Sequence, residues 1–326
     1  MKKIIITLLV LIAAISITAC TSGTVPTATN PPDLEQGTPD TKPEQTAPPV
    51  DTSSAIKIQL NGAAITAGEG VSVDGKVATI TAAGTYEVTG KLNDGQLIIE
   101  ADNCEVNLIL NNVEIHCSNS APLFVKKADH IHLSLAEGST NTLTDGNAYN
   151  LEPGITEPDA TLFSKADMTI SGDGTLNIKA SYNDGIANRD TLVIQSGTIN
   201  VDAVNHAIKG KDFLSVLGGN IKVVAGLDGI KSTQDMDSTL GYVNISGGNI
   251  DIKAVDEAIS AVTNVKINGG TIKIDTSNNA IKAGTFVDIS AGKVTILTQD
   301  KGLVCTEEKL SSKAEVTVNG SKLIVE

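Results

Sequence analysis

The chain has no tryptophan, and aromatic residues make up only 2% of its 326 residues. A core built mainly from aromatic side chains is therefore excluded. Aliphatic and small residues are plentiful instead, with 40% hydrophobic residues and 30 glycines. This composition is sufficient for a globular core and argues against disorder along the whole chain.

Positive charge is also scarce. Lys and Arg number 24 against 38 Asp and Glu, which gives a formal net charge of −14. A chain this acidic repels phosphate backbones, so we expect no nucleic-acid partner. The sequence shows no phosphate-binding loop, HExxH motif, CxxC pair or Ser-His-Asp set, and these absences disfavour the corresponding enzyme classes.

The first twenty residues have the features of a secretion signal. Lys2 and Lys3 precede an apolar run that is shorter than the roughly 20 residues of a membrane-spanning helix. The segment closes on Ile17-Thr18-Ala19-Cys20, which resembles a bacterial lipobox. We expect residues 1–19 to be removed and Cys20 to carry lipid; an ordinary cleaved signal with an incidental cysteine is the alternative.

A linker is expected over residues 20–54. Seven prolines lie between Pro26 and Pro49 among Thr, Asp and Gln, so the segment cannot bury a core and stays extended. Loss of Lys2 and Lys3 lowers the net charge to −16, which makes anionic lipid a poor partner for the folded part. We therefore expect an extracytoplasmic protein, exposed at the cell surface and held to the cell membrane by its lipid anchor alone.

Three cysteines remain if Cys20 is lipidated, and an odd number permits at most one disulfide within the chain. Cys104 and Cys117 are the natural pair, with Cys305 left over. Free thiols that fill small core sites are an equally good interpretation.

A 22-residue spacing recurs in the C-terminal half. Its reference glycines follow one another at intervals of 22, 29, 22 and 22 residues: Gly197, Gly219, Gly248, Gly270 and Gly292. Apolar and polar residues alternate on both sides of each glycine, and a further aliphatic residue follows eleven positions later. Alternation of period two indicates strands with one buried face. Three short strands in each unit predict an all-β parallel β-helix, a solenoid with rungs of about 22 residues.

The folded domain is expected over residues 55–326. Regular rungs are predicted over 170–305, a cap with irregular first rungs over 55–143, and a long loop over 145–159. A β-sandwich followed by a β-helix is the alternative.

Two polar positions recur just before the third strand, and stacking at about 4.8 Å would align them in columns. The first column contains Asn183, Asn205, Leu227, Asp256, Asn278 and Asp300, and the second Asp184, His206, Asp228, Glu257, Asn279 and Lys301. Stacked carboxylates repel by roughly 3 kcal/mol per pair at an effective dielectric of 20, and Ca²⁺ relieves such repulsion. The candidate calcium ligands are Asp184, Asp228, Asp256, Glu257, Asn279 and Asp300. Corner residues that only cap backbone groups are the alternative.

Cationic side chains lie close to these acids. Lys209, Lys231 and Lys282 follow the third-strand aliphatic residue, and His206 falls between two acids in its column. We name Lys209, Lys231 and His206 as candidate ligand-binding residues. Their alternative role is charge balance on a solvated face.

Several motifs, taken in order, resemble one family. They follow the lipobox and the Pro/Thr linker and include Leu60-Asn61-Gly62, Gly84-Thr85-Tyr86, Ala136-Glu137-Gly138-Ser139-Thr140, Ile170-Ser171-Gly172-Asp173-Gly174 and Leu227-Asp228-Gly229-Ile230-Lys231. Over about residues 55–305 the chain resembles the clostridial cell-surface carbohydrate-binding β-helix family, similar in fold to family 9 pectate lyases. A known member binds cellulose and polygalacturonate. The resemblance implies a right-handed parallel β-helix with bound calcium that acts as a binding module.

The family pattern carries over unevenly. Asp184 and Asp228 lie in Asp-Gly-Ile motifs and match it most directly, whereas Asp256-Glu257-Ala258 keeps two acids but loses the glycine, and Asn205-His206-Ala207 loses the acid. We expect non-catalytic, calcium-assisted binding of polygalacturonate or cellulose, and the few aromatic rings favour the former. The alternatives are a calcium-dependent pectate lyase, in which Lys209 or Lys231 abstracts the proton α to the carboxylate, and a structural or adhesive surface solenoid without a glycan ligand.

Overall fold

The computed structural model describes residues 53–323. The signal segment, Cys20 and the linker up to residue 52 lie outside the described residues. All regular structure within 53–323 is β, with thirty strands and no helix, which confirms the all-β class. No helix in this part of the chain could cross a bilayer.

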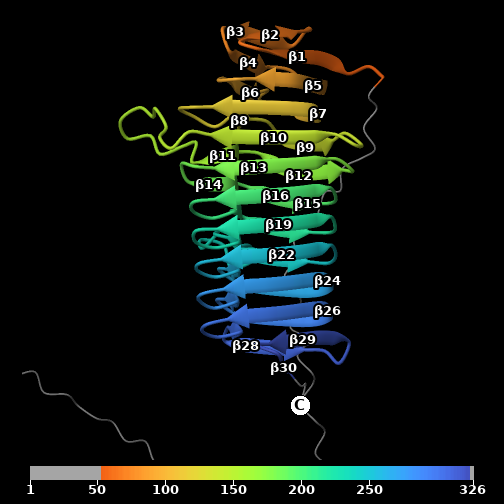
Figure 1. Cartoon of the computed structure of the whole chain (residues 1–326), viewed down its shortest axis with the longest axis vertical. Coiled ribbons are helices and arrows are strands. Elements are labelled where there is room, and N and C mark those ends of the chain that lie inside the picture. The colour runs from red at the N-terminus through yellow and green to blue at the C-terminus, as the bar shows by residue number, and fades with distance from the viewer. Residues whose placement is uncertain (1–52, 324–326) are drawn as a thin grey trace, which may run out of the picture. The chain divides into compact units, whose positions relative to one another are not determined.

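The strands form two sheets, and Figure 1 shows them one above another from β1 to β30. The larger, 19-stranded sheet contains β1 (Ile56–Gly62), β2 (Ala64–Ala67), β5 (Gly84–Leu92), β7 (Glu105–Cys117), β9 (His130–Leu135), β10 (Thr140–Asp145), β12 (Asp167–Gly172), β13 (Thr175–Ala180), β15 (Thr191–Ile194), β16 (Thr198–Ala203), β18 (Phe213–Val216), β19 (Asn220–Ala225), β21 (Tyr242–Ile245), β22 (Asn249–Ala254), β24 (Asn264–Thr276), β26 (Phe286–Thr298), β28 (Glu307–Leu310), β29 (Ala314–Val318) and β30 (Ser321–Lys322). The 11-stranded sheet contains β3 (Val71–Asp74), β4 (Val77–Ile80), β6 (Gln96–Glu100), β8 (Leu123–Lys127), β11 (Ala160–Ser164), β14 (Asp184–Asn188), β17 (Ile208–Gly210), β20 (Ile230–Ser232), β23 (Ile259–Ala261), β25 (Ile281–Ala283) and β27 (Leu303–Val304).

Aliphatic side chains set the register of both sheets. In the larger sheet Ile199 pairs with Ile221, and Ile221 pairs with Ile250. In the smaller sheet Ile208 pairs with Ile230, and Ile230 with Ile259. All six side chains are buried in one continuous core, because each alternates with a residue that points outward.

The predicted right-handed β-helix of regular three-strand rungs is wrong. The strands lie in two large sheets and not in three. The strands predicted before and after each recurring glycine belong to the same sheet. β24 and β26 run through Gly270 and Gly292 as single strands of 13 residues. Pairing is also irregular at both ends, where β1–β2, β3–β4 and β29–β30 are antiparallel.

The recurring glycines explain this continuity. Gly248, Gly270 and Gly292 have φ near +90°, a conformation that side chains disfavour. A Cβ atom on Gly292, within β26, would lie 2.8 Å from the carbonyl oxygen of Gly269 in β24. The glycine thus bends the strand without ending its pairing, which a pattern of three separate strands does not anticipate.

The cysteines do not cross-link the sheets. Cys104, Cys117 and Cys305 are free, with Cys117 buried and the other two partly buried. The structure therefore agrees with the interpretation of these cysteines as free thiols and not with a disulfide between Cys104 and Cys117.

Candidate functional site

The second polar column lies at the turns that lead into the smaller sheet. Backbone hydrogen bonds hold these turns in line: the N–H groups of Gly185, Ala207 and Gly229 donate to the carbonyl oxygens of His206, Asp228 and Glu257 at 3.0 Å each. Successive column residues therefore sit one strand spacing apart. Gly185 and Gly229 let their turns pack tightly against the core. A Cβ atom on Gly185 would lie 2.2 Å from Val201, and one on Gly229 would lie 2.4 Å from Ile252.

Three column side chains, those of Asp184, His206 and Asp228, also bond to the backbone of the next column residue. The His206 N–H donates to Asp184 Oδ1 at 3.2 Å, and the Glu257 N–H donates to Asp228 Oδ1 at 3.1 Å. Between them, the Asp228 N–H donates to His206 Nδ1 at 3.2 Å. These bonds are the backbone-capping role that the sequence left as an alternative to metal binding.

Three buried acids of the column are paired with lysines of the smaller sheet. Lys209 of β17 donates to Asp184, and Lys231 of β20 donates to Asp228 Oδ2 at 2.6 Å. Lys282 of β25 donates to Glu257 Oε1 at 2.8 Å. This last bond raises the pKa of Lys282. Burial of a carboxylate costs several kcal/mol unless such a partner is present.

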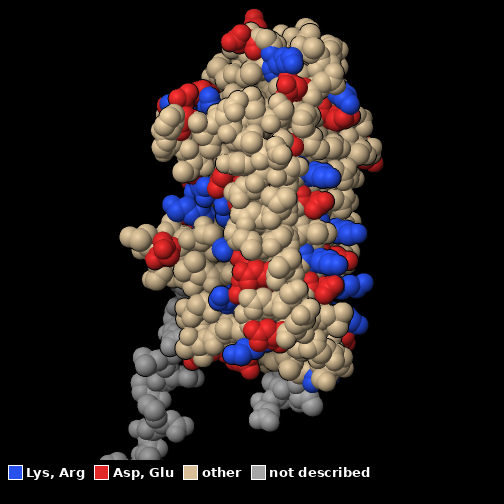
Figure 2. All heavy atoms as spheres, turned by 60° about the vertical axis from the view of Figure 1, so that its left-hand side comes forward, with Lys and Arg blue, Asp and Glu red and all other residues tan. Residues whose placement is uncertain are grey.

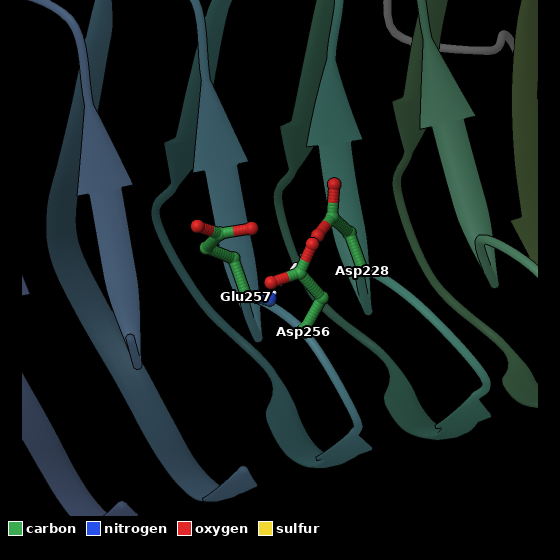
Figure 3. Close-up of side chains that lie close together, drawn as sticks. All are labelled: Asp228, Asp256 and Glu257. Carbon is green, nitrogen blue, oxygen red and sulfur yellow. Dashed lines mark hydrogen bonds between the residues drawn. The ribbon is translucent and has the colours of Figure 1, made fainter. Parts of the chain in front are cut away.

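Asp228, Asp256 and Glu257 converge on one point. One carboxylate oxygen from each lies within 4.8 Å of the others, and Figure 3 shows the three side chains coming from two neighbouring turns. Asp256 Oδ1 also accepts a hydrogen bond from Asn278 Nδ2 at 2.5 Å. Asn279 Nδ2 lies 3.4 Å from Glu257 Oε1. These carboxylates can supply three of the six to eight oxygen ligands that Ca²⁺ takes.

The other predicted metal ligands lie apart from this cluster. Asp184 is buried beside Lys209, whose Nζ also lies 3.5 Å from Asp159 Oδ2. Asp300 is exposed on the turn before β27. The structure thus brings together Asp228, Asp256 and Glu257, with Asn279 at the edge, and does not bring Asp184 or Asp300 to them.

The predicted ligand-binding residues differ in access. Lys209 is buried and ion-paired, whereas the Lys231 side chain is 28% exposed. His206 is partly buried, and its burial lowers its pKa although Asp184 acts in the opposite direction. Of the three, Lys231 is the one placed to meet a large ligand.

A surface groove of about 470 Å³ lies beside the acid cluster. Lys231, Ser260 and Lys282 line it from β20, β23 and β25, and the strand register places them in one row. The Lys282 side chain is 50% exposed. Figure 2 shows acidic and basic side chains next to one another on the molecule rather than a field of one sign.

Sequence reasoning missed Ser260, and it placed Lys282 beside the acids without naming it among the ligand-binding candidates. The available signal was the position after the third-strand aliphatic residue, where Lys209, Lys231 and Lys282 are interrupted by Ser260. The small side chain leaves space between two lysines. That space is part of the groove.

Comparison with known proteins places the chain in a family. The family model for carbohydrate-binding domain-containing proteins matches residues 74–326. The chain belongs to this family. A member from Acetivibrio thermocellus is 38% identical over 137 residues, which cover 41% of this chain and 48% of the relative, about half of its length.

A solved structure is also similar. It is a polysaccharide lyase-like protein from C. thermocellum, determined as a gadolinium derivative. The match has a TM-score of 0.70 and 33% sequence identity, and it covers 80% of this chain and 98% of the other. The sequence comparison and the structural comparison therefore both lead to proteins whose descriptions refer to carbohydrates.

Proposed function

We propose that the protein is a non-catalytic polysaccharide-binding protein that recognises acidic, pectin-type glycan with the help of calcium. Membership in the carbohydrate-binding family supports a polysaccharide partner. The observation that carries the choice of glycan is the groove between Lys231 and Lys282, which lies beside three convergent carboxylates. A chain with net charge −14 needs local cations to hold a polyanion.

The groove offers suitable chemistry for a uronate. The ammonium groups of Lys231 and Lys282 can donate to its carboxylate, and the Ser260 hydroxyl can bond to ring hydroxyls. No cluster of coplanar aromatic rings lines the groove. This favours polygalacturonate over cellulose.

Calcium would be held by Asp228, Asp256 and Glu257, with Asn279 as a further oxygen donor. Its contribution is to neutralise these carboxylates and to offer coordination positions to uronate oxygens. A cation at this cluster competes with Lys231 and Lys282 for the same carboxylates. Displacement leaves both ammonium groups available to the glycan, which links calcium binding to glycan binding.

Attachment to the cell surface belongs to the same proposal. The lipobox-like Ile17-Thr18-Ala19-Cys20 and the proline-rich segment that follows support a lipid anchor on Cys20 and a tethered domain outside the cytoplasm.

A lyase is the second candidate, because the similar solved structure is described as polysaccharide lyase-like. Proton abstraction needs a lysine that has lost its own proton and faces the substrate. Lys209 is buried against Asp184, Lys231 donates to Asp228, and the raised pKa of Lys282 keeps its proton in place. Of these contacts, the one between Lys209 and Asp184 lies outside the acid cluster and persists when a cation binds there, so Lys209 is excluded as the base. Binding is proposed over catalysis because Lys231 and Lys282 keep their protons in the cation-free structure.

Titration calorimetry with oligogalacturonate in calcium tests the groove. Lys231→Gln and Lys282→Gln should each weaken binding by about tenfold or more, as expected for one lost charge-assisted hydrogen bond. Lys253→Gln is the matched control, because Lys253 is an exposed lysine of β22 in the other sheet. Equal affinities for all four proteins would overturn the assignment of the groove.

A further inference from the structure

One outward-facing row of the larger sheet is covered, whereas outward positions of β19 and β22 in the same sheet are open. Four side chains in register on β9, β12, β15 and β18 point away from the core, yet their exposed fractions are 6% for His132, 0% for Thr169, 1% for Val193 and 0% for Ser215. At outward positions of β19 and β22, Val224 is 40% exposed and Lys253 is exposed. Alternation alone would leave both rows open to solvent.

The covered row and its margins contain polar atoms without a partner in the described part of the chain. Asn107 Oδ1, His132 Nδ1, Ser134 Oγ, Asn264 Oδ1 and Asp288 Oδ1 are buried and form no hydrogen bond there. All five belong to β7, β9, β24 and β26 of the larger sheet. Buried polar atoms are rarely left unsatisfied, because each costs about 1–3 kcal/mol. The missing partner must therefore be polar and extended along the row.

Further along, the row becomes apolar. The rings of Phe213 and Tyr242 stack with centroids 4.8 Å apart, and Val193, Leu217 and Leu240 pack around them in a cluster separate from the main core. Stacked aromatic surfaces of this kind bind proline-rich segments in the polyproline II conformation, whose backbone carbonyls are free to accept hydrogen bonds.

We propose that residues 39–52 of the same chain bind along this row. The register supports this assignment: Ile56 begins β1 and pairs with Tyr86, which pairs with Leu108, and Leu108 pairs with Leu133. Ala55 therefore enters the sheet at the head of the row that continues through Asn107 and His132. The segment contains Pro39, Pro43, Pro48 and Pro49.

The segment is also long enough. From β1 to β21 the strand pairings span about 34 Å at a strand spacing of about 4.8 Å. Fourteen residues in polyproline II conformation extend about 43 Å. A tethered segment reaches an effective concentration in the millimolar range, so it needs few contacts to outcompete a second copy of the protein.

Hydrogen exchange on the full chain, kept in mild detergent, tests the proposal directly. The amides of Glu44, Gln45 and Thr46 should exchange at least about tenfold more slowly than those of an unstructured peptide, which corresponds to about 1.4 kcal/mol of protection. Exchange at the unstructured rate would overturn the proposal. Protection that rises with protein concentration would also overturn it, because a second copy would then cover the row.

Two outward valines provide a matched pair of variants. Val193→Asp should remove the protection of residues 44–46, whereas Val224→Asp should leave it unchanged. In a chain whose residues 39–52 are replaced by Gly and Ser, the two substitutions should lower the thermal midpoint equally. A larger loss from Val193→Asp in that chain would show that another element covers the row.

Discussion

The backbone N–H of Asp228 donates to Nδ1 of His206 at 3.2 Å, so the imidazole accepts a hydrogen bond from the neighbouring turn. The acceptor nitrogen must be unprotonated, which assigns the neutral form with its proton on Nε2. Asp184 and Asp228 make the equivalent bond with carboxylate oxygens. His206 thus replaces an acid in the column while it preserves the contact between turns.

Removal of this acceptor should destabilise the fold. His206→Ala leaves the Asp228 N–H without its partner, at a cost of about 1–3 kcal/mol. His206→Asn should recover most of that loss, because its amide oxygen can accept the Asp228 N–H as Asp184 Oδ1 accepts the N–H of residue 206. Urea denaturation of the three proteins checks the order of stability, and equal losses for alanine and asparagine would contradict the role of the hydrogen bond.

Stability should fall as the pH drops through 6.5 because of two histidines. Burial lowers the pKa of His206 and of His132 below the usual 6.5, although Asp184 and Glu105, respectively, act in the opposite direction. The unfolded chain then takes up protons at a higher pH than the folded chain does. The stabilisation is therefore present above about pH 6.5 and is lost as the pH falls through 6.5 toward the lowered values.

Thermal unfolding in chelator, measured at several pH values, tests this dependence. Chelator removes any contribution of calcium from the comparison. The double variant His206→Asn/His132→Asn should have a flatter profile than the parent in this range. Identical slopes would show that other groups control stability there.

The buried pair of Asp184 and Lys209 should behave differently from a surface pair. Asp184→Ala leaves the Lys209 ammonium buried without its main partner and should cost about 3–5 kcal/mol. The double variant Asp184→Ala/Lys209→Met should recover a large part of that loss. Glu114→Ala breaks the exposed pair with Lys91 and should cost at most about 1 kcal/mol. A lower denaturation midpoint for Glu114→Ala than for Asp184→Ala would contradict this account.

The bends within and between strands depend on glycine at positions where the backbones approach closely; Gly248 lies at the bend between β21 and β22. Gly248→Ala places a Cβ atom 2.9 Å from a carbonyl oxygen at a positive φ, whereas Gly138 has a similar φ and no atom within 4 Å of such a Cβ. Gly138→Ala should cost about 1 kcal/mol from backbone strain, and Gly248→Ala should cost clearly more because the neighbouring strand must shift. Calorimetric unfolding of both variants measures the difference, and equal costs would contradict a close-packed bend.

Local pattern predicted the strands better than their assembly. The alternation around Gly197 places Ile199 and Val201 inward, and both are buried. The same pattern suggested three separate strands, because alternation cannot show whether pairing continues through a glycine bend. That depends on the contact between neighbouring strands, as at Gly292 of β26 and Gly269 of β24.

The candidate site was predictable in composition but not in pairing. The spacing put Asp228 and Glu257 in one column, and the structure keeps them in adjacent turns. It could not show that Lys231 bonds an acid of its own unit, whereas Lys209 and Lys282 reach back 25 residues to Asp184 and Glu257. Lys231 has an acid three residues back in Asp228, whereas the equivalent residues before Lys209 and Lys282 are His206 and Asn279, so these two lysines pair with the acid of the preceding unit.

Calcium-dependent binding to polygalacturonate is the central claim, and one measurement tests it most directly. The purified full chain is mixed with insoluble polygalacturonate in calcium or in chelator, while protein depletion and the ultraviolet absorbance of unsaturated product are followed together. The account predicts depletion in calcium, little depletion in chelator and flat absorbance in both. Rising absorbance would show a lyase, and absence of depletion in calcium would contradict the proposed ligand.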